Sequence, residues 1–239
     1  MKIAIIGYGK MGHEIEGILK ERNHQVSAII NIDSIEEIHQ INNDNTDVAI
    51  EFTAPEAAYE NIITLLDKGV KTISGSTGWL DKIQDVEKIV KENKGSFFYA
   101  SNYSLGVNIT FRLNEILAKM MEGKGYSPEL EEIHHIHKLD SPSGTALTLA
   151  SGIINNNNAI DDWQEKKQVE KNILPITSFR KGEVPGTHTV IYNSEEDSIE
   201  LKHTAHSRRG FALGAVMVAE WIQNKSGFLS MDDYFDFSL

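Results

Sequence analysis

The sequence contains no cysteine, only 5 prolines, and 23 Lys and Arg residues against 35 Asp and Glu residues. Without cysteine the chain can form no disulfide, no thiolate metal site and no thiol nucleophile. The formal net charge of -12 argues against a basic surface for nucleic acid, so we expect no nucleic-acid partner. An anionic substrate would need positive charge that is concentrated locally against this overall field.

Long apolar runs are also missing. No stretch approaches the roughly 18 apolar residues that cross a membrane. Residues 2–6 begin as a strand and not as a secretion signal. We therefore expect a cytoplasmic protein that does not enter a membrane. The 239 residues, 40% of them apolar, are typical of a globular protein with one large domain or two small ones.

Strands and helices alternate over the first hundred residues. Short apolar runs predict strands, and apolar residues at helical spacing predict a helix after each of most of these strands. Thr53 to Glu56 matches a capping box that would open one of these helices. This alternation predicts a Rossmann-like, doubly wound parallel sheet in residues 1–105. The expected strands are residues 2–6, 26–30, 47–52, 70–74 and 96–100.

The pattern changes over residues 106–211. Strand-like stretches follow one another there, with a helix before them and a further helix that begins near Ser143. We expect a second, α+β domain with a mixed sheet, and a solvated loop or helix face at residues 161–171. A last apolar helix within residues 212–239 is predicted to complete the first domain. Gly106 is a candidate hinge for closure of the two domains.

The clearest motif is Gly7-x-Gly9-x-x-Gly12, which lies between a predicted strand and a predicted helix. Glycines in this setting permit a tight turn and let the backbone approach a pyrophosphate at the helix N-terminus. The flanking elements that the motif requires are present, so we interpret it as a dinucleotide site.

The cofactor preference depends on the end of the second strand. Asn31 and Asp33 are the candidates for holding the ribose hydroxyls, although Asn31 is a weaker acceptor than a carboxylate. No Lys or Arg lies beside them in the sequence to favour a 2′-phosphate. We therefore expect NADH or NADPH, with a slight preference for NADH.

A second group of residues runs from Glu132 to Ala146 and includes His134, His135, His137 and Lys138. On a regular strand His134 and Lys138 would share one face, unless the strand ends there and the chain turns. A metal site is not expected, because an ammonium group stands beside the imidazoles and no cysteine is available. We interpret His137 as an ordinary surface histidine.

Pro142 to Thr145 is a predicted helix start that follows this cluster directly. Free N–H groups and the two hydroxyls could bind an anion, or Ser143 could simply cap its own helix. Imidazoles and an ammonium beside an N–H-rich turn are suited to gripping a carboxylate and delivering a proton.

The stretch Glu132 to Ala146 resembles the long signature of the 4-hydroxy-tetrahydrodipicolinate reductases, also called dihydrodipicolinate reductases. Further similar segments cover most of the chain, namely residues 51–55, 75–78, 100–108, 180–188 and 203–214. The resemblance implies NAD(P)H-dependent reduction of a cyclic dicarboxylate in lysine and diaminopimelate biosynthesis. It also implies a homotetramer built by the second domain.

The resemblance also implies roles for individual residues. His134 would be the proton donor or acceptor and Lys138 the proton donor, while His135, Ser143, Gly144 and Thr145 would hold substrate. The implied cofactor contacts are Gly7, Tyr8, Gly9, Lys10, Met11, Gly12, Asn31, Gly75, Ser76, Thr77, Ala100, Ser101, Asn102 and Tyr103.

The sequence departs from the family at two places that concern the cofactor. Asn31 stands where many members have an acid, followed by Ile32 where some have Arg, and Gly75-Ser76-Thr77 replaces the commoner Gly-Thr-Thr. Two alternatives remain at this stage. One is another Rossmann reductase of imines or carbonyls, such as an amino-acid dehydrogenase, and the other is a nicotinamide-sensing protein without turnover. Arg208 and Arg209 could add positive potential or form surface ion pairs.

Overall fold

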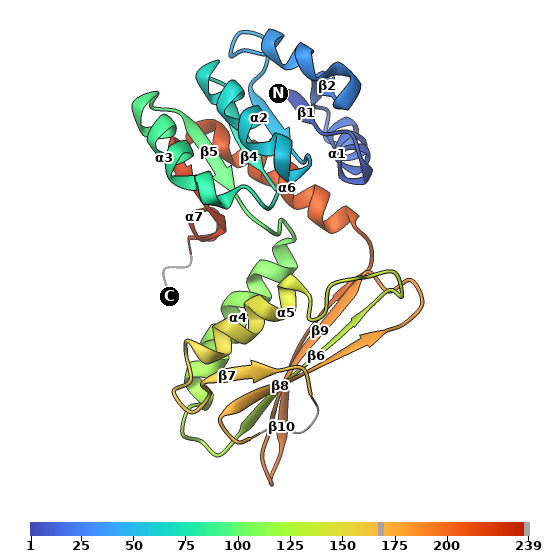
Figure 1. Cartoon of the computed structure of the whole chain (residues 1–239), viewed down its shortest axis with the longest axis vertical. Helices are drawn as coiled ribbons and strands as arrows, with labels where there is room; N and C mark the ends of the chain where they lie inside the picture. The colour runs from blue at the N-terminus through green and yellow to red at the C-terminus, as the bar shows by residue number, and fades with distance from the viewer. Residues whose placement is uncertain (167–169, 237–239) are drawn as a thin grey trace. The chain divides into compact units, whose positions relative to one another are not determined.

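The computed structural model describes residues 1–166 and 170–236 and contains two compact units (Figure 1). Residues 1–104 and 208–239 form the first unit, and residues 105–207 form the second. The chain thus leaves the first unit once and returns to it with its C-terminal segment. The sequence placed the two boundaries after residues 105 and 211, and the structure places them after residues 104 and 207.

The first unit is built on a six-stranded sheet in which every neighbouring pair is parallel. The strand order is β11-β5-β4-β3-β1-β2. The chain moves outward from β1 to β2 and then returns to the other side of β1 to form β3. Ligands of such sheets bind at the carboxyl ends of the strands at this reversal. The bounds are β1 (Lys2–Ile6), β2 (Gln25–Ile30), β3 (Val48–Glu51), β4 (Lys71–Ser74), β5 (Ser96–Tyr99) and β11 (Gly227–Leu229).

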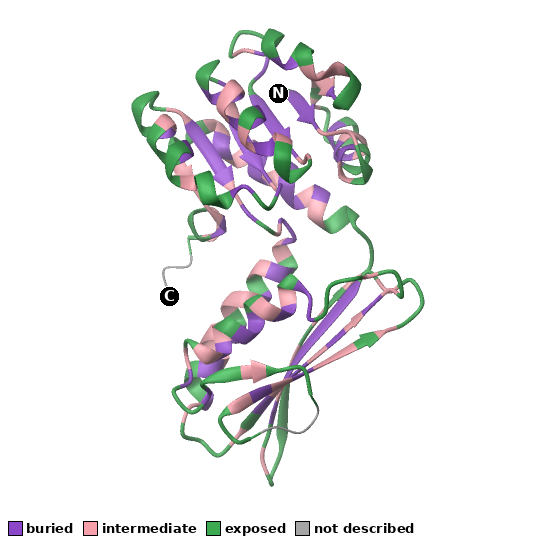
Figure 2. Ribbon diagram, viewed as in Figure 1, coloured by how far each residue is buried: buried purple, intermediate pink, exposed green. Residues whose placement is uncertain are grey.

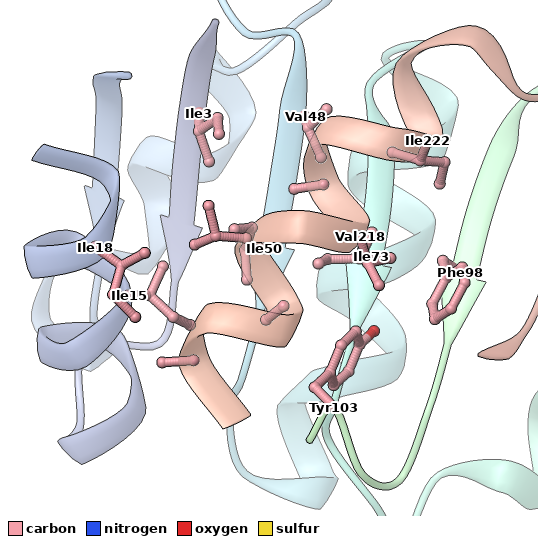
Figure 3. Packing of buried hydrophobic residues seen from close by; sticks show 14 of the residues in the cluster. Ile3, Ile15, Ile18, Val48, Ile50, Ile73, Phe98, Tyr103, Val218 and Ile222 are labelled. Carbon is pink, nitrogen blue, oxygen red and sulfur yellow. The ribbon is translucent and has the colours of Figure 1, made fainter. Parts of the chain in front are cut away.

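Helices cover both faces of this sheet. Alternate side chains of β1 point to opposite faces, so Ile3 and Ile5 lie in one core and Ala4 and Ile6 in another. The first core contains α1 (Lys10–Glu21) and α6 (Arg209–Trp221), which Figure 3 shows against the sheet. The opposite cores contain α2 (Pro55–Asp67), α3 (Ile83–Glu92) and the 3₁₀ segment η1 (Ile32–Gln40). The short elements are η2 (Leu80–Lys82), η3 (Ile222–Asn224) and α7 (Met231–Phe235).

The second unit has a five-stranded mixed sheet in the order β10-β9-β6-β8-β7. β8 runs parallel to β6 and β7, whereas β9 is antiparallel to both of its neighbours. Helices α4 (Leu105–Met121) and α5 (Gly144–Ile154) lie side by side and share a core with the sheet. Leu130, Ile176 and Val190 of three adjacent strands belong to this core. Figure 2 shows buried segments, in purple, along the strands of this sheet. The strands are β6 (Ser127–His134), β7 (Asp162–Gln164), β8 (Ile173–Arg180), β9 (Gly186–Asn193) and β10 (Ser198–Ala205).

The predicted fold class is confirmed, with corrections in detail. The capping box at Thr53 is wrong, because α2 has Ala54 as its N-cap and Pro55 in its first turn. Thr53 instead donates hydrogen bonds to the buried carboxylate of Glu51. The stretch 161–171 contains the short strand β7, and residues 167–169 of it lie outside the described part of the chain. Among the described helices, none combines the length and the apolar character needed to cross a bilayer.

Helix α6 packs closely against the backbone of Tyr103, and a glycine stands at the point of contact. A Cβ added to Gly214 would lie 1.8 Å from the Tyr103 carbonyl oxygen, whereas one on Gly210 in the same helix meets nothing within 4 Å. We predict that Gly214→Ala lowers the free energy of unfolding by about 3 kcal/mol, since the clash exceeds the gain of about 1 kcal/mol in helix propensity.

The matched control is Gly210→Ala, which should be neutral or slightly stabilising. Chemical denaturation of both variants checks the prediction. Equal stability of Gly214→Ala and the wild type would show that α6 does not pack as closely as described.

Candidate active site

The three glycines of the turn between β1 and α1 differ in their surroundings: two pack against protein atoms and one faces open space. Gly7 has φ 95°, and a Cβ there would lie 2.0 Å from the Phe52 carbonyl oxygen. A Cβ on Gly12 would lie 2.4 Å from the Gly7 carbonyl oxygen. At Gly9, by contrast, a Cβ would have no protein atom within 4 Å. Gly7 and Gly12 therefore allow the turn to pack, and Gly9 leaves the open approach that a pyrophosphate needs.

A cavity of about 440 Å³ opens beside this turn, where β1, β2 and β3 end. Tyr8 and Asn31, both expected from the sequence, line it together with Gly7 and Gly9. The other lining residues were not expected, and they include no Lys, Arg, Asp or Glu. They are Ile6, Ile30, Ile32, Ile35, Phe52, Thr53, Ala54, Ala57 and Asn61. The cavity is apolar with a few neutral polar groups, as is typical of a nucleoside site.

Asn31 acts in the structure as the N-cap of η1. Its Oδ1 atom accepts hydrogen bonds from the backbone N–H groups of Asp33 and Ser34, at 2.8 and 3.1 Å. The oxygen is therefore engaged by the protein itself, and the Nδ2 group is the part of the side chain left for a ligand. Asp33 is exposed and does not line the cavity.

A buried carboxylate organises the loops that follow β3 and β4. Glu51 is fully buried and accepts hydrogen bonds from Ser74 Oγ at 2.5 Å, Ser76 Oγ at 2.8 Å and the Thr53 N–H at 2.9 Å. Burial raises the pKa of Glu51, and the hydroxyl groups of Ser74, Thr53 and Ser76 oppose that rise. The hydroxyl of Ser76, which the sequence predicted to contact the cofactor, thus donates its hydrogen bond to Glu51.

The remaining expected cofactor residues do not line the cavity. Tyr103 is buried and donates from its hydroxyl to the Ser74 carbonyl oxygen at 2.9 Å, which joins the ends of β4 and β5. Gly75 packs directly against the Phe52 ring, where a Cβ would come within 2.1 Å. The others follow β4 and β5 or begin α1, at the carboxyl edge of the sheet, and they are Lys10, Met11, Gly12, Ser76, Thr77, Ala100, Ser101 and Asn102.

In the second unit, β6 ends at His134 and the chain turns. The histidines therefore do not alternate across a regular strand. His134 is buried, whereas the exposed His137 pairs with Glu183 at 3.1 Å, in agreement with its interpretation as a surface histidine. Lys138 Nζ lies 2.9 Å from both carboxylate oxygens of Asp140, and this pair lowers the pKa of Asp140.

Helix α5 begins as the sequence predicts. Ser143 is its N-cap, and its Oγ accepts a hydrogen bond from the Ala146 N–H at 3.2 Å. The Ser143 N–H donates to Glu132, whose two oxygens lie 3.1 and 3.3 Å away. The N–H groups of Gly144 and Thr145 make no hydrogen bond within the described parts of the chain. Two donors at a helix N-terminus are thus available to an anion.

Three functional candidates were missed in the sequence. Glu132, Arg180 and His188 come from adjacent strands and meet beside Ser143, on the face of the sheet that α4 and α5 cover. Arg180 Nη1 lies 3.4 Å and His188 Nε2 lies 3.6 Å from Glu132. The period of two between Glu132 and His134 was a readable signal, because it places both on one strand face.

Burial and charge set the protonation of this cluster. Burial, together with the charges of His188, Lys138 and Arg180, lowers the pKa of His134 to about 4, against the opposing effect of Glu132. Burial alone would raise the pKa of Glu132, but hydrogen bonds from His188 and Ser143 outweigh it and hold that pKa well below its usual range. The ring of His134 is therefore neutral and Glu132 ionised near neutral pH.

The spacing of Glu132, His134 and His188 would also suit a metal ion, since their ligand atoms lie within 4.8 Å of one another. However, the Arg180 guanidinium and the Ser143 N–H already engage the carboxylate. A cation there would be repelled by Arg180 and would displace these hydrogen bonds. The cluster is better described as a hydrogen-bonded network.

The two arginines near the unit boundary differ in their surroundings. Arg209 pairs with Glu21 of α1, which is the surface ion pair considered for it from the sequence. Arg208 is the N-cap residue of α6.

The lowered pKa of His134 predicts a stability that depends on pH. Between the ordinary pKa of 6.5 and the folded pKa of about 4, the unfolded chain takes up a proton at this histidine and the folded chain does not. The free energy of unfolding should therefore fall by about 2 kcal/mol between pH 7 and pH 5 on account of His134.

Denaturation of His134→Gln at both pH values checks this prediction, because the variant should lose that part of the pH dependence. His137→Gln, at an exposed histidine, is the control and should retain it. An unchanged pH dependence in His134→Gln would contradict the assigned environment.

Comparison with known proteins agrees with these two units. The family model "Dihydrodipicolinate reductase, N-terminus" matches residues 1–103, and the model "Dihydrodipicolinate reductase, C-terminus" matches residues 106–235. A 4-hydroxy-tetrahydrodipicolinate reductase of Christiangramia forsetii is 48% identical over 234 residues, which cover 98% of this chain and 97% of the relative. One from Archaeoglobus fulgidus is 38% identical over 208 residues, which cover 80% and 77%.

A solved structure shares the fold of the whole chain. Dipicolinate-bound dihydrodipicolinate reductase from Paenisporosarcina sp. TG-14 superposes with a TM-score of 0.80 and covers 98% of both chains, at 22% identity. At that identity the likeness concerns the fold. The sequence matches to the family models and to the curated relatives show the family to which the chain belongs.

Proposed function

The chain belongs to the dihydrodipicolinate reductase family and reduces 4-hydroxy-tetrahydrodipicolinate to tetrahydrodipicolinate with NAD(P)H, and on that premise we propose which residues carry the reaction. The overall change is loss of water from the substrate, addition of a hydride, and addition of a proton. The reaction serves lysine and diaminopimelate biosynthesis. An amino-acid dehydrogenase or a sensor without turnover is not favoured, because neither accounts for the match of the second unit to this family.

The first unit supplies the cofactor site. The open approach at Gly9 and the neutral cavity beside Tyr8 and Asn31 fit a dinucleotide, which would supply the hydride. Gly7 to Gly12 would hold the pyrophosphate. The loops that follow β4 and β5, from Gly75 to Thr77 and from Ala100 to Tyr103, would contact the rest of the cofactor.

The second unit supplies the substrate site and the proton. The free N–H groups of Gly144 and Thr145 would pair with one substrate carboxylate, and His135 would contact the substrate beside them. His134 would exchange a proton with the substrate, and the Lys138 ammonium would donate one. Because Lys138 is paired with Asp140, that ion pair must open or rearrange when Lys138 acts.

NADH is the cofactor that the cavity favours. Its lining carries no positive side chain that could pair with a 2′-phosphate, and Asn31 offers a neutral amide. The resemblance to the family further supports a homotetramer in the cytoplasm.

Cofactor preference tests this assignment. We predict that the wild type binds NADH more tightly than NADPH, that Ile32→Arg shifts the ratio about tenfold toward NADPH by adding a charge-assisted hydrogen bond, and that Asn31→Asp shifts it toward NADH by repulsion. Aspartate also caps helices, so Asn31→Asp should keep η1 intact.

Calorimetric titration of both cofactors measures the ratio. Leu80→Arg adds the same charge at an exposed apolar residue outside the cavity and is the control. Equal shifts in Ile32→Arg and Leu80→Arg would mean that the 2′ position does not lie near Ile32.

Turnover tests the proton donor. We predict that Lys138→Ala lowers the turnover number by about 10²-fold, the scale of losing an acid catalyst. The assay follows nicotinamide absorbance with substrate made freshly by dihydrodipicolinate synthase, and exposed Lys124→Ala is the control. Unchanged turnover in folded Lys138→Ala would assign the donor elsewhere, and no oxidation of either cofactor by the wild type would refute the function itself.

A further inference from the structure

The carboxylate of Glu132 lies at the centre of the second unit's polar cluster. Its exposed fraction is 0%, and in the sheet register it stands opposite His188 on β9 and Ser178 on β8. A buried charge of this kind is retained at a large cost unless donors surround it. Ser143, Arg180 and His188 supply such donors, and His134 Nδ1 lies 3.5 Å from the same carboxylate.

The surroundings of His188 decide where its proton lies. Nε2 is 3.1 Å from Ser143 Oγ and 3.6 Å from Glu132, both of which can accept a hydrogen bond. Nδ1 is buried and has no partner among the described residues. A buried N–H without an acceptor costs about 1–3 kcal/mol, which favours a proton on Nε2 over one on Nδ1. His188 thereby links Glu132 to the N-cap of α5.

The surroundings of His134 favour the opposite tautomer. Its Nδ1 is buried and makes no hydrogen bond among the described residues, but unlike Nδ1 of His188 it lies 3.5 Å from the Glu132 carboxylate. Its Nε2 lies beside Gly186, where an added Cβ would be only 3.1 Å away. The ring also packs edge-on against His188, with centroids 5.0 Å apart and an interplanar angle of 69°. A carboxylate at Nδ1 attracts the proton of a neutral imidazole to that nitrogen. The lone pair then lies on Nε2.

We propose that Glu132 and His188 are positioning residues of the reductase: Glu132 holds His134 as the Nδ1–H tautomer, so that Nε2 is the atom that exchanges a proton with substrate, and His188 secures the ring and the N-terminus of α5. This inference rests on the proposed function only in naming the reductase substrate as the partner with which Nε2 exchanges a proton. The proton taken up or released at Nε2 converts the ring between its neutral form and the imidazolium, which the Glu132 carboxylate stabilises. The arrangement uses the principle by which a buried carboxylate orients the histidine of a hydrolase triad.

Glycine at position 186 is consistent with this geometry. A Cβ there would press on the Nε2 side of His134, and the backbone φ of 158° is open to glycine. Gly186 therefore leaves the Nε2 side of the ring uncrowded by a side chain.

Nuclear magnetic resonance of the full chain, labelled with ¹⁵N-histidine in a deuterated background, tests the tautomer directly. In the wild type near pH 7.5, His134 should show a protonated Nδ1 and an unprotonated Nε2. Glu132→Gln should add the Nε2–H form, because an amide can accept or donate, and Glu132→Asp should largely restore the wild-type spectrum. A wild type with the Nε2–H form, or a Glu132→Gln spectrum unchanged at His134, would overturn the proposal.

Kinetics give a second readout. Glu132→Gln should lower the turnover number by about 10- to 100-fold, the range seen when carboxylates that orient metal-bound histidines are removed. The substrate KM should change less. The charged and titratable groups facing His134 are Glu132, His188, Lys138 and Arg180, and of these only Glu132 raises its pKa. The acidic limb of the pH profile should therefore move to lower pH in Glu132→Gln and stay in place in Glu132→Asp.

Glu131→Gln is the matched control, since the neighbouring glutamate points to the other face of β6. It should leave the tautomer, the turnover number and the pH profile unchanged. If Glu132→Gln does not fold, the wild-type spectrum alone still decides the tautomer. If the wild type does not oxidise NAD(P)H with substrate, the proposed function fails while the tautomer remains measurable.

Discussion

The second unit depends on the need to satisfy one buried charge. Glu132 is ionised and fully buried, so groups from three other segments converge on it. The Ser143 N–H brings the start of α5 to the sheet, and Arg180 and His188 come from the strands on either side. The same network includes His134, whose Nδ1 lies 3.5 Å from the carboxylate, and the N-cap of α5. The network that satisfies the carboxylate thereby also fixes the positions of the His134 ring and of the N-terminus of α5.

The first unit also contains a buried carboxylate, that of Glu51, and neutral groups donate hydrogen bonds to it. Glu51 ends β3 and collects hydroxyl groups from Ser74, Ser76 and Thr53. These hydrogen bonds tie the loops that follow β3 and β4 to one point at the carboxyl edge of the sheet. The cavity beside this edge is lined by no charged side chain. Such a lining is consistent with a dinucleotide that meets backbone N–H groups.

The comparison of the three glycines shows how binding and packing share one motif. Gly7 and Gly12 are required by neighbouring protein atoms, and they would be required without any cofactor. Gly9 faces open space, so its lack of a side chain concerns a ligand. A motif match cannot separate these reasons, because all three positions are written with the same residue. The contacts made by an added Cβ do separate them.

Local patterns in the sequence determined much of this protein. Alternation of short apolar runs with helical spacing identified the parallel sheet, and Ser143 before an apolar run identified the start of α5, because both signals act within one or two turns of chain. The stretch Glu132 to Ala146 was distinctive enough to indicate the family.

Only the tertiary structure decided which polar groups meet. Glu132, Arg180 and His188 lie on strands far apart in sequence, and the register of three strands brings them together. The turn after His134 separates His137 from the buried ring, and Asn31 proved to cap η1 with the oxygen that was expected to face a ribose. Thr53 likewise turned away from its expected cap toward Glu51. Each outcome follows from burial of a charge or pairing across strands, which are long-range constraints that no local spacing records.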